Sequence, residues 1–182
     1  MKILIATGIY PPEIGGPAKY AESLYDTWKK QGHSVAVKVF SKLNSFPTGI
    51  RHLLYFFSIF PSVARADYIL ILDTFSSALP TVIASFFFTK KVVLRTGGDF
   101  LWEQYVERTG DLVLLRDFYK TRMNRLTFKE KFIMSLIRFV LNNVDTVVWS
   151  TEWQKNIFWE PYKLSRQKHK IIENYYGSLK KI

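Results

Sequence analysis

Short apolar runs, each closed by Gly, Pro or a polar turn, recur along the chain and are separated by longer amphipathic stretches. An apolar run of about four to eight residues between turn signals is typical of a strand buried in a sheet. Such runs predict strands at Lys2–Ile9, Ser34–Phe40, Tyr68–Leu72, Lys91–Arg95, Thr146–Trp149 and Lys170–Glu173. In the second of these strands Val35, Val37 and Val39 alternate with other residues, as in a strand with two different faces.

The stretches between the predicted strands have apolar residues at helical spacing. In the first stretch Pro17 is followed by Ala21, Leu24 and Trp28, and Gly32 stands where a glycine after a helix is favoured. Further helices are predicted over Ile50–Ala66, Ser77–Phe88 and Glu152–Trp159, and over 111–143 as two helices with a break near Thr127. This alternation indicates the α/β class: a doubly wound, mainly parallel, Rossmann-like sheet covered on both faces, with residues 1–182 forming a single domain.

Two apolar stretches raise the question of a membrane span. Tyr68–Phe88 contains Asp73, Pro80 and several Ser and Thr residues, and Leu53–Ala64 is shorter and contains Pro61. Because a spanning helix needs about 20 predominantly apolar residues, we expect both stretches to be buried in a soluble core. The apolar start of the chain is too short for a signal peptide and is followed at once by a Pro-Pro pair. We therefore expect a cytoplasmic protein.

The composition and the missing motifs exclude several kinds of chemistry. The 182 residues include no Cys, so disulfides, a thiol nucleophile and Cys-based metal sites are excluded. The 3 His residues have no partners at metal-ligand spacing, and no metal is predicted. Neither a P-loop nor a G-x-S-x-G elbow occurs. The longer, proline-stiffened path from Gly8 to Gly15 differs from the tight G-x-G-x-x-G turn of NAD-binding proteins, so no cofactor is predicted.

Ligands of open α/β sheets bind outside the carboxyl ends of the strands. Four loops follow such ends here, namely Thr7–Pro17, Asp73–Ser76, Thr96–Glu103 and Ser150–Glu152. Gly15 and Gly16 stand at a predicted helix N-terminus, where backbone N–H groups and the helix dipole favour an anion such as phosphate. The same two residues fit a simple turn before Pro17, and the residues alone leave both interpretations open.

The start of the chain has the most specific motif. Residues 2–24 read KILIATGIYPPEIGGPAKYAESL, and Gly32-His33 precede the alternating valines. This segment resembles the opening of GT-B glycosyltransferases of the group 1 type (GT4-like), in which a strand leads to a P-P-x-x-G-G loop, a helix and G-H-x-V-x-V. Looser matches to the same family follow in order: VVLRTGGDFLWE at 92–103, VDTVVWSTEWQ at 144–154 and KIIENYYG at 170–177.

The resemblance implies one half of a two-domain enzyme. The family transfers a sugar from a nucleotide-sugar donor to an acceptor hydroxyl, with retention and without a metal, in a cleft between two Rossmann-like domains. All matched segments belong to the N-terminal, acceptor-side domain. The donor-binding domain with its E-x7-E motif would follow Asn174 and Gly177 and is absent from this sequence. We therefore expect this domain to be inactive in isolation.

The resemblance also implies the partners of the chain. These are a nucleotide sugar, a glycan or lipid-linked acceptor, and a C-terminal GT-B domain in cis or in trans. The alternative is a non-catalytic binding or membrane-docking subunit that works with a separate donor-binding chain.

Individual residues receive roles from the same resemblance. Gly15 and Gly16 match the glycine loop that approaches the donor diphosphate. Where the family often presents a histidine near the reacting sugar, this chain has Asp99, which becomes the candidate catalytic residue. The candidates that line the cleft or contact the acceptor are Arg95, Gly97, Gly98, Glu103, Thr151 and Glu152. Without the family context an ordinary turn or helix N-cap is the favoured interpretation of Asp99, whereas Thr151 fits a helix cap and a ligand contact equally well. On the same terms Glu103 fits a solvated helix face and Arg95 a structural ion pair.

The net charge of +11 is concentrated in the second part of the chain. Residues 113–182 carry 14 basic and 6 acidic side chains, and basic residues alternate with large apolar ones over 116–142. A basic amphipathic helix in this segment would contact an anionic membrane, which adds peripheral membrane association to the expected location. The same residues fit a helix packed on the sheet with a solvated basic face. No nucleic-acid-binding signature accompanies the charge, so nucleic acid is not an expected partner.

Overall fold

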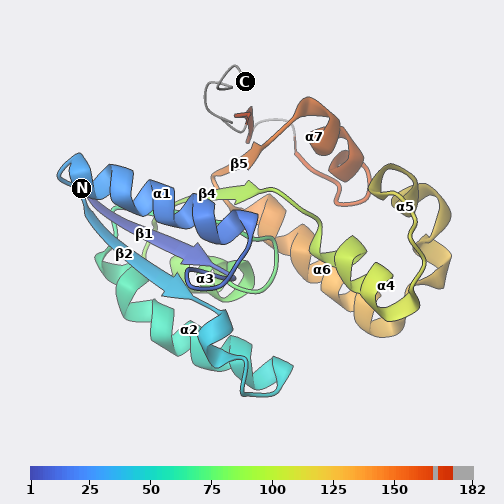
Figure 1. Cartoon of the computed structure of the whole chain (residues 1–182), viewed down its shortest axis with the longest axis horizontal. Coiled ribbons are helices and arrows are strands. Elements are labelled where there is room, and N and C mark those ends of the chain that lie inside the picture. The colour runs from blue at the N-terminus through green and yellow to red at the C-terminus, as the bar shows by residue number, and fades with distance from the viewer. Residues whose placement is uncertain (166–167, 174–182) are drawn as a thin grey trace, which may run out of the picture.

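The six described strands of the computed structural model run parallel in one sheet (Figure 1). The structure describes residues 1–165 and 168–173. The strands are β1 (Lys2–Thr7), β2 (Ser34–Val39), β3 (Tyr68–Ile71), β4 (Lys91–Thr96), β5 (Thr146–Trp149) and β6 (His169–Ile171), and they lie in the order β2-β1-β3-β4-β5-β6. This arrangement confirms the predicted α/β class with a doubly wound parallel sheet.

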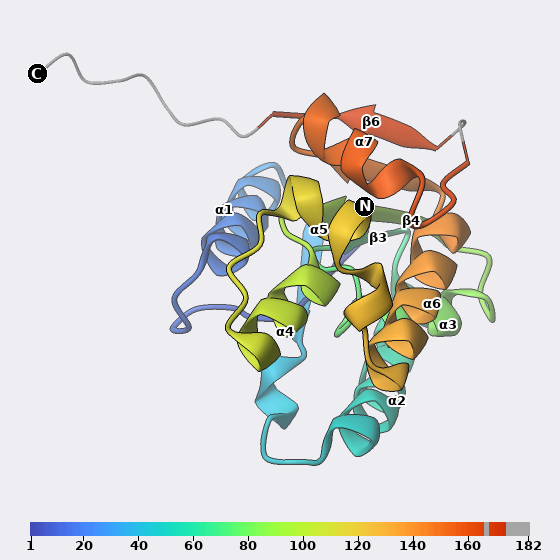
Figure 2. The same cartoon turned by 90° about the vertical axis from the view of Figure 1, so that its right-hand side faces the viewer.

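Helices cover both faces of the sheet (Figures 1 and 2). They are α1 (Gly16–Lys30), α2 (Thr48–Arg65), α3 (Ala78–Ser85), α4 (Phe100–Thr109), α5 (Leu115–Thr121), α6 (Phe128–Asn143) and α7 (Glu152–Trp159), with short 3-10 turns at Ser41–Leu43 and Met123–Arg125. The chain crosses from β1 to β2, which pairs with one edge of β1, and the later strands are added beyond the opposite edge of β1. Because such crossovers are right-handed, α1 lies on the opposite face from α2, α3 and α6.

The central strand β1 is buried on both faces. Leu4 and Ala6 lie in the larger apolar core, together with Ile59 of α2 and other residues of α3 and α6. Ile5 points to the other side, where it packs with Ala21 of α1. A strand that is covered on both faces needs apolar residues at successive positions, which explains the continuous apolar run at the start of the chain.

Helix α4 is missing from the sequence prediction. It begins at Phe100, inside the predicted loop Thr96–Glu103, and it ends before Gly110, whose φ of 69° is left-handed. The helix is short, and its start depends on a single side chain, Asp99, which accepts hydrogen bonds from the backbone N–H groups of the first turn. Gly97 and Gly98 precede this start, and no long run of apolar residues at helical spacing makes the helix evident from the sequence.

The other predicted elements agree with the structure within a few residues. The predicted break near Thr127 is confirmed, because Thr127 caps α6. The stretch Tyr68–Phe88 folds as a strand, a loop and a short helix, as expected. Among the residues that the structure describes, no helix has the length and apolar character needed to cross a membrane. Asn174 and Gly177, which belong to the last matched segment, lie outside the described residues.

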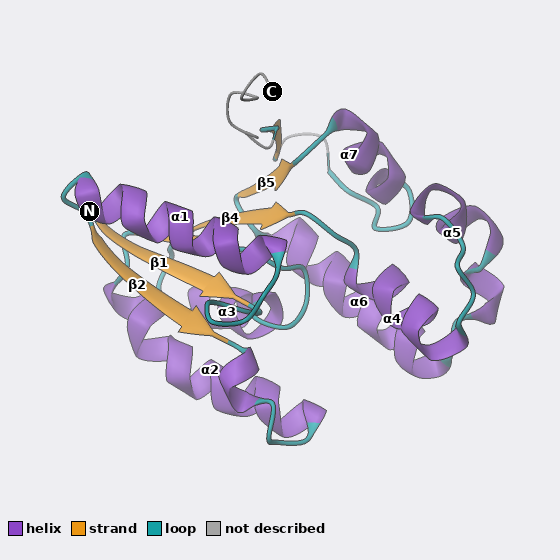
Figure 3. Ribbon diagram, in the orientation of Figure 1, coloured by secondary structure: helices purple, strands orange, loops and turns teal. Residues whose placement is uncertain are grey.

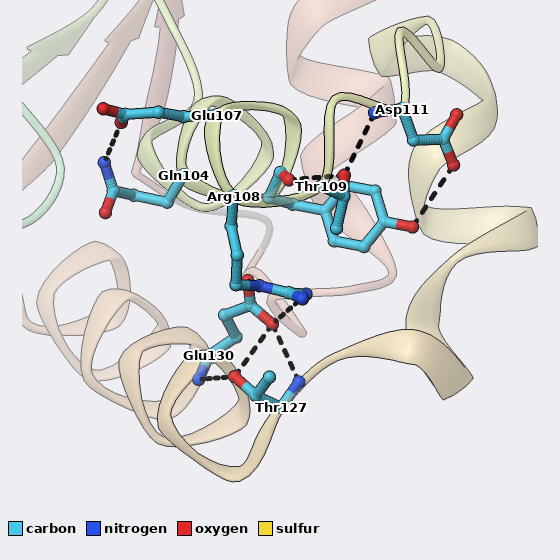
Figure 4. Close-up of polar contacts among 8 residues, drawn as sticks. Gln104, Glu107, Arg108, Thr109, Asp111, Thr127 and Glu130 are labelled. Atoms are coloured by element: carbon cyan, nitrogen blue, oxygen red, sulfur yellow. Dashed lines mark hydrogen bonds and ion pairs between the residues drawn. The ribbon is translucent and has the colours of Figure 1, made fainter.

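Helices α4 and α6 are joined by one charged pair (Figure 4). The guanidinium of Arg108 donates from Nε and Nη2 to the two carboxylate oxygens of Glu130, at 2.8 and 2.9 Å. Glu130 is 4% exposed and also accepts from the backbone N–H of Thr127, which completes a capping box at the start of α6. Burial by itself raises the pKa of Glu130, but the hydrogen bonds from Arg108 and Thr127 more than offset this and hold it below its usual 4.5.

We predict that Glu130→Gln lowers the free energy of unfolding by about 2 kcal/mol at neutral pH, since the charge-assisted bonds of a buried carboxylate are lost. The carboxylate has a lower pKa in the folded than in the unfolded protein. Its stabilisation is therefore present above pH 4.5 and is lost as the pH falls through the folded pKa. Urea unfolding at neutral pH and below pH 4 should show a smaller loss of stability on acidification in the variant than in the wild type.

Glu107→Gln is the matched control, because Glu107 lies on the exposed side of α4, where it accepts a hydrogen bond from the side chain of Gln104. We expect this variant to change the free energy of unfolding by less than about 0.5 kcal/mol. Equal effects of the two substitutions would contradict the role assigned to Glu130.

Candidate functional site

The loops after β1, β3, β4 and β5 leave the sheet at its carboxyl edge, and those after β1, β4 and β5 can be followed in Figure 3. Ala6 is in register with Ile71, and Thr96 with Trp149, so the strands end close to one line. The strand order reverses between β1 and β3, and the edge outside this point is where ligands of doubly wound sheets bind. This edge is the candidate functional site.

A glutamate holds the loop after β1. The Oε2 atom of Glu13 accepts hydrogen bonds from the backbone N–H of Tyr10 at 3.3 Å and from the hydroxyl of Ser41 at 2.5 Å. The peptide bond between Pro11 and Pro12 is cis. The loop is therefore anchored to the segment that follows β2, and it leads directly into α1.

The N-terminus of α1 is open. Gly15 occupies the N-cap position, no side chain caps the helix, and its first turn has no acidic residue. A Cβ atom at Gly16 would have no neighbour within 4 Å, whereas one at Gly15 would lie 2.7 Å from Cδ1 of Ile9. The first backbone N–H groups of a helix have no partner within the helix, so here they are directed at the space beside Gly16. This geometry is compatible with an anion at the helix terminus.

Asp99, the candidate catalytic residue, is buried at the end of the loop after β4. It is 1% exposed, and its Oδ1 atom accepts hydrogen bonds from the backbone N–H groups of Leu101 at 3.0 Å and Trp102 at 3.2 Å. Its Oδ2 atom accepts a hydrogen bond from the hydroxyl of Tyr119. Burial raises the pKa of Asp99 from 3.8 to about 6, although these hydrogen bonds act in the opposite direction. In this structure Asp99 serves as the N-cap of α4.

Two tyrosines complete the surroundings of Asp99, and sequence reasoning missed both. The hydroxyl of Tyr119 lies 2.6 Å from that of Tyr162, which in turn lies 3.5 Å from Oδ1 of Asp99. Burial, followed by the charge of Asp99, raises the pKa of both phenols well above 10, so both remain neutral. These residues come from α5 and from the turn after α7, and no local pattern connects residues so far apart in the sequence.

The other candidates on the loop after β4 lie nearer the surface. Gly97 is exposed and Gly98 is half-buried. A Cβ atom at Gly98 would lie 2.5 Å from Oε1 of Glu103, so the carboxylate of Glu103 folds back over the glycine. Partial loss of water and the nearby charge of Asp99 raise the pKa of Glu103. The structure thus brings Gly98, Asp99 and Glu103 together.

Arg95 lies elsewhere, within the sheet on the side covered by α1. It is 7% exposed, its guanidinium carbon is 4.7 Å from the centre of the Tyr20 ring, and Nη1 donates to the carbonyl of Ile172 at 3.1 Å. These contacts tie β4 to α1 and to the segment after β6. The arginine therefore holds elements of the fold together through an aromatic ring and a backbone carbonyl.

The loop after β5 combines a helix cap with an unsatisfied hydroxyl. Thr151 caps α7 by accepting from the backbone N–H of Gln154 at 3.1 Å, and Glu152 forms a partly exposed ion pair with Lys155. The hydroxyl of Ser150 is buried and has no hydrogen-bond partner among the described residues. Buried polar groups nearly always have a hydrogen-bond partner, so this hydroxyl is an unusual feature of the edge.

A groove of about 570 Å³ lies between α5 and α7, beside the same edge. Its walls include Tyr119, Lys120, Trp153 and Asn156. Trp153 is 56% exposed, so its ring is available to stack on a flat or apolar ligand surface. The groove therefore combines a cationic group, an aromatic ring and an amide next to the Asp99 network.

The carboxyl edge thus has backbone hydrogen-bond donors suited to an anion at the start of α1, and a groove with polar and aromatic walls between α5 and α7. Its most buried acid, Asp99, serves to cap α4. Among the described residues no group of three or more His, Asp or Glu is placed to hold a metal ion. Comparison with models of known protein families finds no match, and comparison with curated proteins finds no similar sequence. The glycosyltransferase likeness therefore depends on the motifs themselves.

We predict that the side-chain carboxyl of Asp99 titrates near pH 6 in an NMR experiment and that Tyr119→Phe raises this value, because the phenol stabilises the carboxylate. The folded pKa lies above the unfolded one. The contribution of Asp99 to stability is therefore fully present below pH 3.8 and is lost as the pH rises through about 6. In Asp99→Asn the free energy of unfolding should lose this dependence, which amounts to about 3 kcal/mol.

Tyr105→Phe serves as the control, because Tyr105 is also a buried tyrosine but its hydroxyl bonds to Asp111. The pKa of Asp99 should be the same in this variant as in the wild type. A midpoint near 4 in the wild-type protein would rule out the burial of the carboxyl described above.

Proposed function

We propose that the chain is the N-terminal, acceptor-side domain of a retaining GT-B glycosyltransferase, which moves a sugar from a nucleotide donor to an acceptor hydroxyl. The observation that carries the proposal is the open N-terminus of α1 at Gly15 and Gly16, placed beside the point where the strand order reverses. The motif that resembles this family contains the same two glycines.

Each group at the carboxyl edge would have a role in the proposed sugar transfer. As the bond to the sugar breaks, negative charge develops on the departing diphosphate, and the first N–H groups of α1 are oriented to stabilise it. The acceptor would lie in the groove between α5 and α7, where Trp153 and Lys120 face the ligand space. Asp99 would act by holding the start of α4, and Glu103, with its raised pKa, is the more accessible acid on the same loop.

The remaining parts of the enzyme would be supplied by a second Rossmann-like domain with the paired glutamates. In the alternative proposal this chain is a non-catalytic binding or membrane-docking subunit whose donor-binding partner is a separate chain. This alternative is favoured because Asp99, which stands where the family often has its histidine, is buried as the N-cap of α4 and presents no exposed side chain at the edge.

We predict that the 182-residue chain alone binds nucleotide sugars only weakly, with a dissociation constant of about 1 mM or higher, and that the amides of Gly16 and Ala18 shift in NMR titrations. Gly16→Asp places a carboxylate at the helix start and should weaken binding at least about threefold. Gly49→Asp, in the similarly open first turn of α2, should have no effect. Shifts that ignore Gly16 and follow another surface would contradict the proposed donor site.

Transfer assays test both proposals, and the origin of the donor-binding domain distinguishes them. Neither predicts turnover by the isolated chain, so robust transfer by the purified protein would refute both. A reading frame that continues into a domain with E-x7-E supports the first proposal. Co-purification with a separate donor-binding chain supports the second.

A further inference from the structure

The outer surface of the layer formed by α2, α3 and α6 is apolar. Each of these helices, or the turn that follows it, exposes a large phenylalanine: Phe57 is 64% exposed, Phe87 is 66% exposed and Phe128 is 88% exposed. The three helices pack side by side on one face of the sheet. We call their solvent-facing side the outer helix face.

Helices α2 and α6 each have two apolar stripes. In α2 the residues Tyr55, Ile59 and Val63 are buried against the core, whereas Ile50, Leu53, Leu54 and Phe57 follow helical spacing on the opposite side and are exposed. A helix that covers a sheet needs one apolar stripe for the core, and its other side is normally polar. The second stripe of α2 is left largely exposed by the rest of the described chain.

Helix α6 repeats this arrangement. Ile133 and Ile137 are buried, and the exposed residues Phe128, Phe132 and Phe139 recur at intervals of four and seven on the other side. Both helices run antiparallel to the strands, so their N-terminal ends lie toward the carboxyl edge. The outer helix face therefore reaches from the amino edge of the sheet to the candidate functional site.

Ring contacts make the outer helix face continuous. The ring of Phe57 lies 5.4 Å from that of Phe56, which lies 6.5 Å from the ring of Phe87. On the other side of α3, the rings of Phe86 and Phe139 are 5.9 Å apart. Aromatic side chains thus connect α2 to the turn after α3, and that turn to α6. Patches of this kind on a soluble surface mark interaction sites.

The charges on and around the outer helix face have one sign. The ranges 48–66 and 78–91 contain no Asp or Glu. In α6 the sole acidic residue, Glu130, is buried and paired with Arg108. The exposed charged residues are basic and include Arg65, Lys129 and Lys131. The exposed acids Asp67, which follows α2, and Asp145, which precedes β5, both lie at the amino edge. Asp67 accepts a hydrogen bond from the backbone N–H of Lys2, and Asp145 forms an ion pair with Lys91.

We infer that the outer helix face docks onto an anionic lipid bilayer. The exposed Phe and Leu side chains have no polar end and suit the boundary between headgroups and acyl chains, and the surrounding Lys and Arg residues suit lipid phosphates. A second copy of the chain fits less well, because two such faces would bring like charges together. Within the segment 116–142, which the sequence suggested for membrane contact, α6 is the part that lies on this face.

This inference goes beyond the proposed sugar transfer and does not depend on it. Its test is co-sedimentation of the full chain with vesicles of phosphatidylcholine, either pure or with about one third phosphatidylglycerol. The wild-type protein should bind the anionic vesicles, and bind them more weakly at high salt. The triple variant Phe57→Ser, Phe87→Ser, Phe132→Ser should bind at least about tenfold more weakly, because its apolar contact with the bilayer is lost.

Matched control variants distinguish binding through the outer helix face from non-specific hydrophobic or electrostatic binding elsewhere on the surface. Ile14 and Leu112 are 95% and 83% exposed but lie in other loops, so Ile14→Ser with Leu112→Ser should bind like the wild type. For the charges, Lys129→Glu with Lys131→Glu should weaken binding to anionic vesicles, whereas Lys29→Glu with Lys30→Glu, at the end of α1, should weaken it less. Circular dichroism of each variant checks that these exposed substitutions preserve the fold.

Three results would overturn the inference. The first is a wild-type protein that binds neither kind of vesicle, and the second is a folded triple variant that binds as well as the wild type. The third is a wild-type dimer in analytical ultracentrifugation that the triple variant converts to a monomer while neither binds vesicles; the face would then join copies of the chain. No nucleotide sugar is present in the assay, so failure of the transferase proposal would leave these outcomes unchanged.

Discussion

Parallel strand pairing is the constraint on which the rest of the structure depends. Because neighbouring strands run in the same direction, every connection must cross the sheet, and the crossing segments become the helices that cover it. The same constraint collects the loops after β1, β3, β4 and β5 at one edge, whatever their sequences. The open start of α1, the buried cap at Asp99 and the unsatisfied hydroxyl of Ser150 therefore share an edge although they are far apart in the chain.

The sequence predicted the fold well because burial on both faces produces a strong signal. Runs such as Lys2–Thr7 are apolar at successive positions, and the helices between them have apolar residues at regular spacing. The prediction failed at α4, where ten residues depend on one N-cap and on a tertiary ion pair with α6 that no local pattern shows. Short helices of this kind are stabilised by their surroundings more than by their own propensity.

The candidate site was predictable in its position but not in its partners. The rule that ligands bind at carboxyl edges selected loops that the structure does bring to one edge, and Asp99 and Thr151 do cap helices, as the structural interpretations allowed. The contacts of Asp99 with Tyr119 and Tyr162, and of Arg95 with Tyr20, join distant elements, so single-sequence reasoning had no means to pair them.

The outer helix face could not be predicted from the sequence for a related reason. Helix α2 is apolar on two sides, and only packing distinguishes the buried stripe from the exposed one.

The strand order also has a consequence for how the chain acquires its structure during synthesis. β2 pairs with one edge of β1, β3 then pairs with the other, and β4, β5 and β6 each add to the strand that was made just before. None of these six strands has to be inserted between two that are already paired. The sheet can therefore grow outward from its first strand in the order in which the ribosome delivers the chain, and from β4 onward each new strand pairs with the one made just before it.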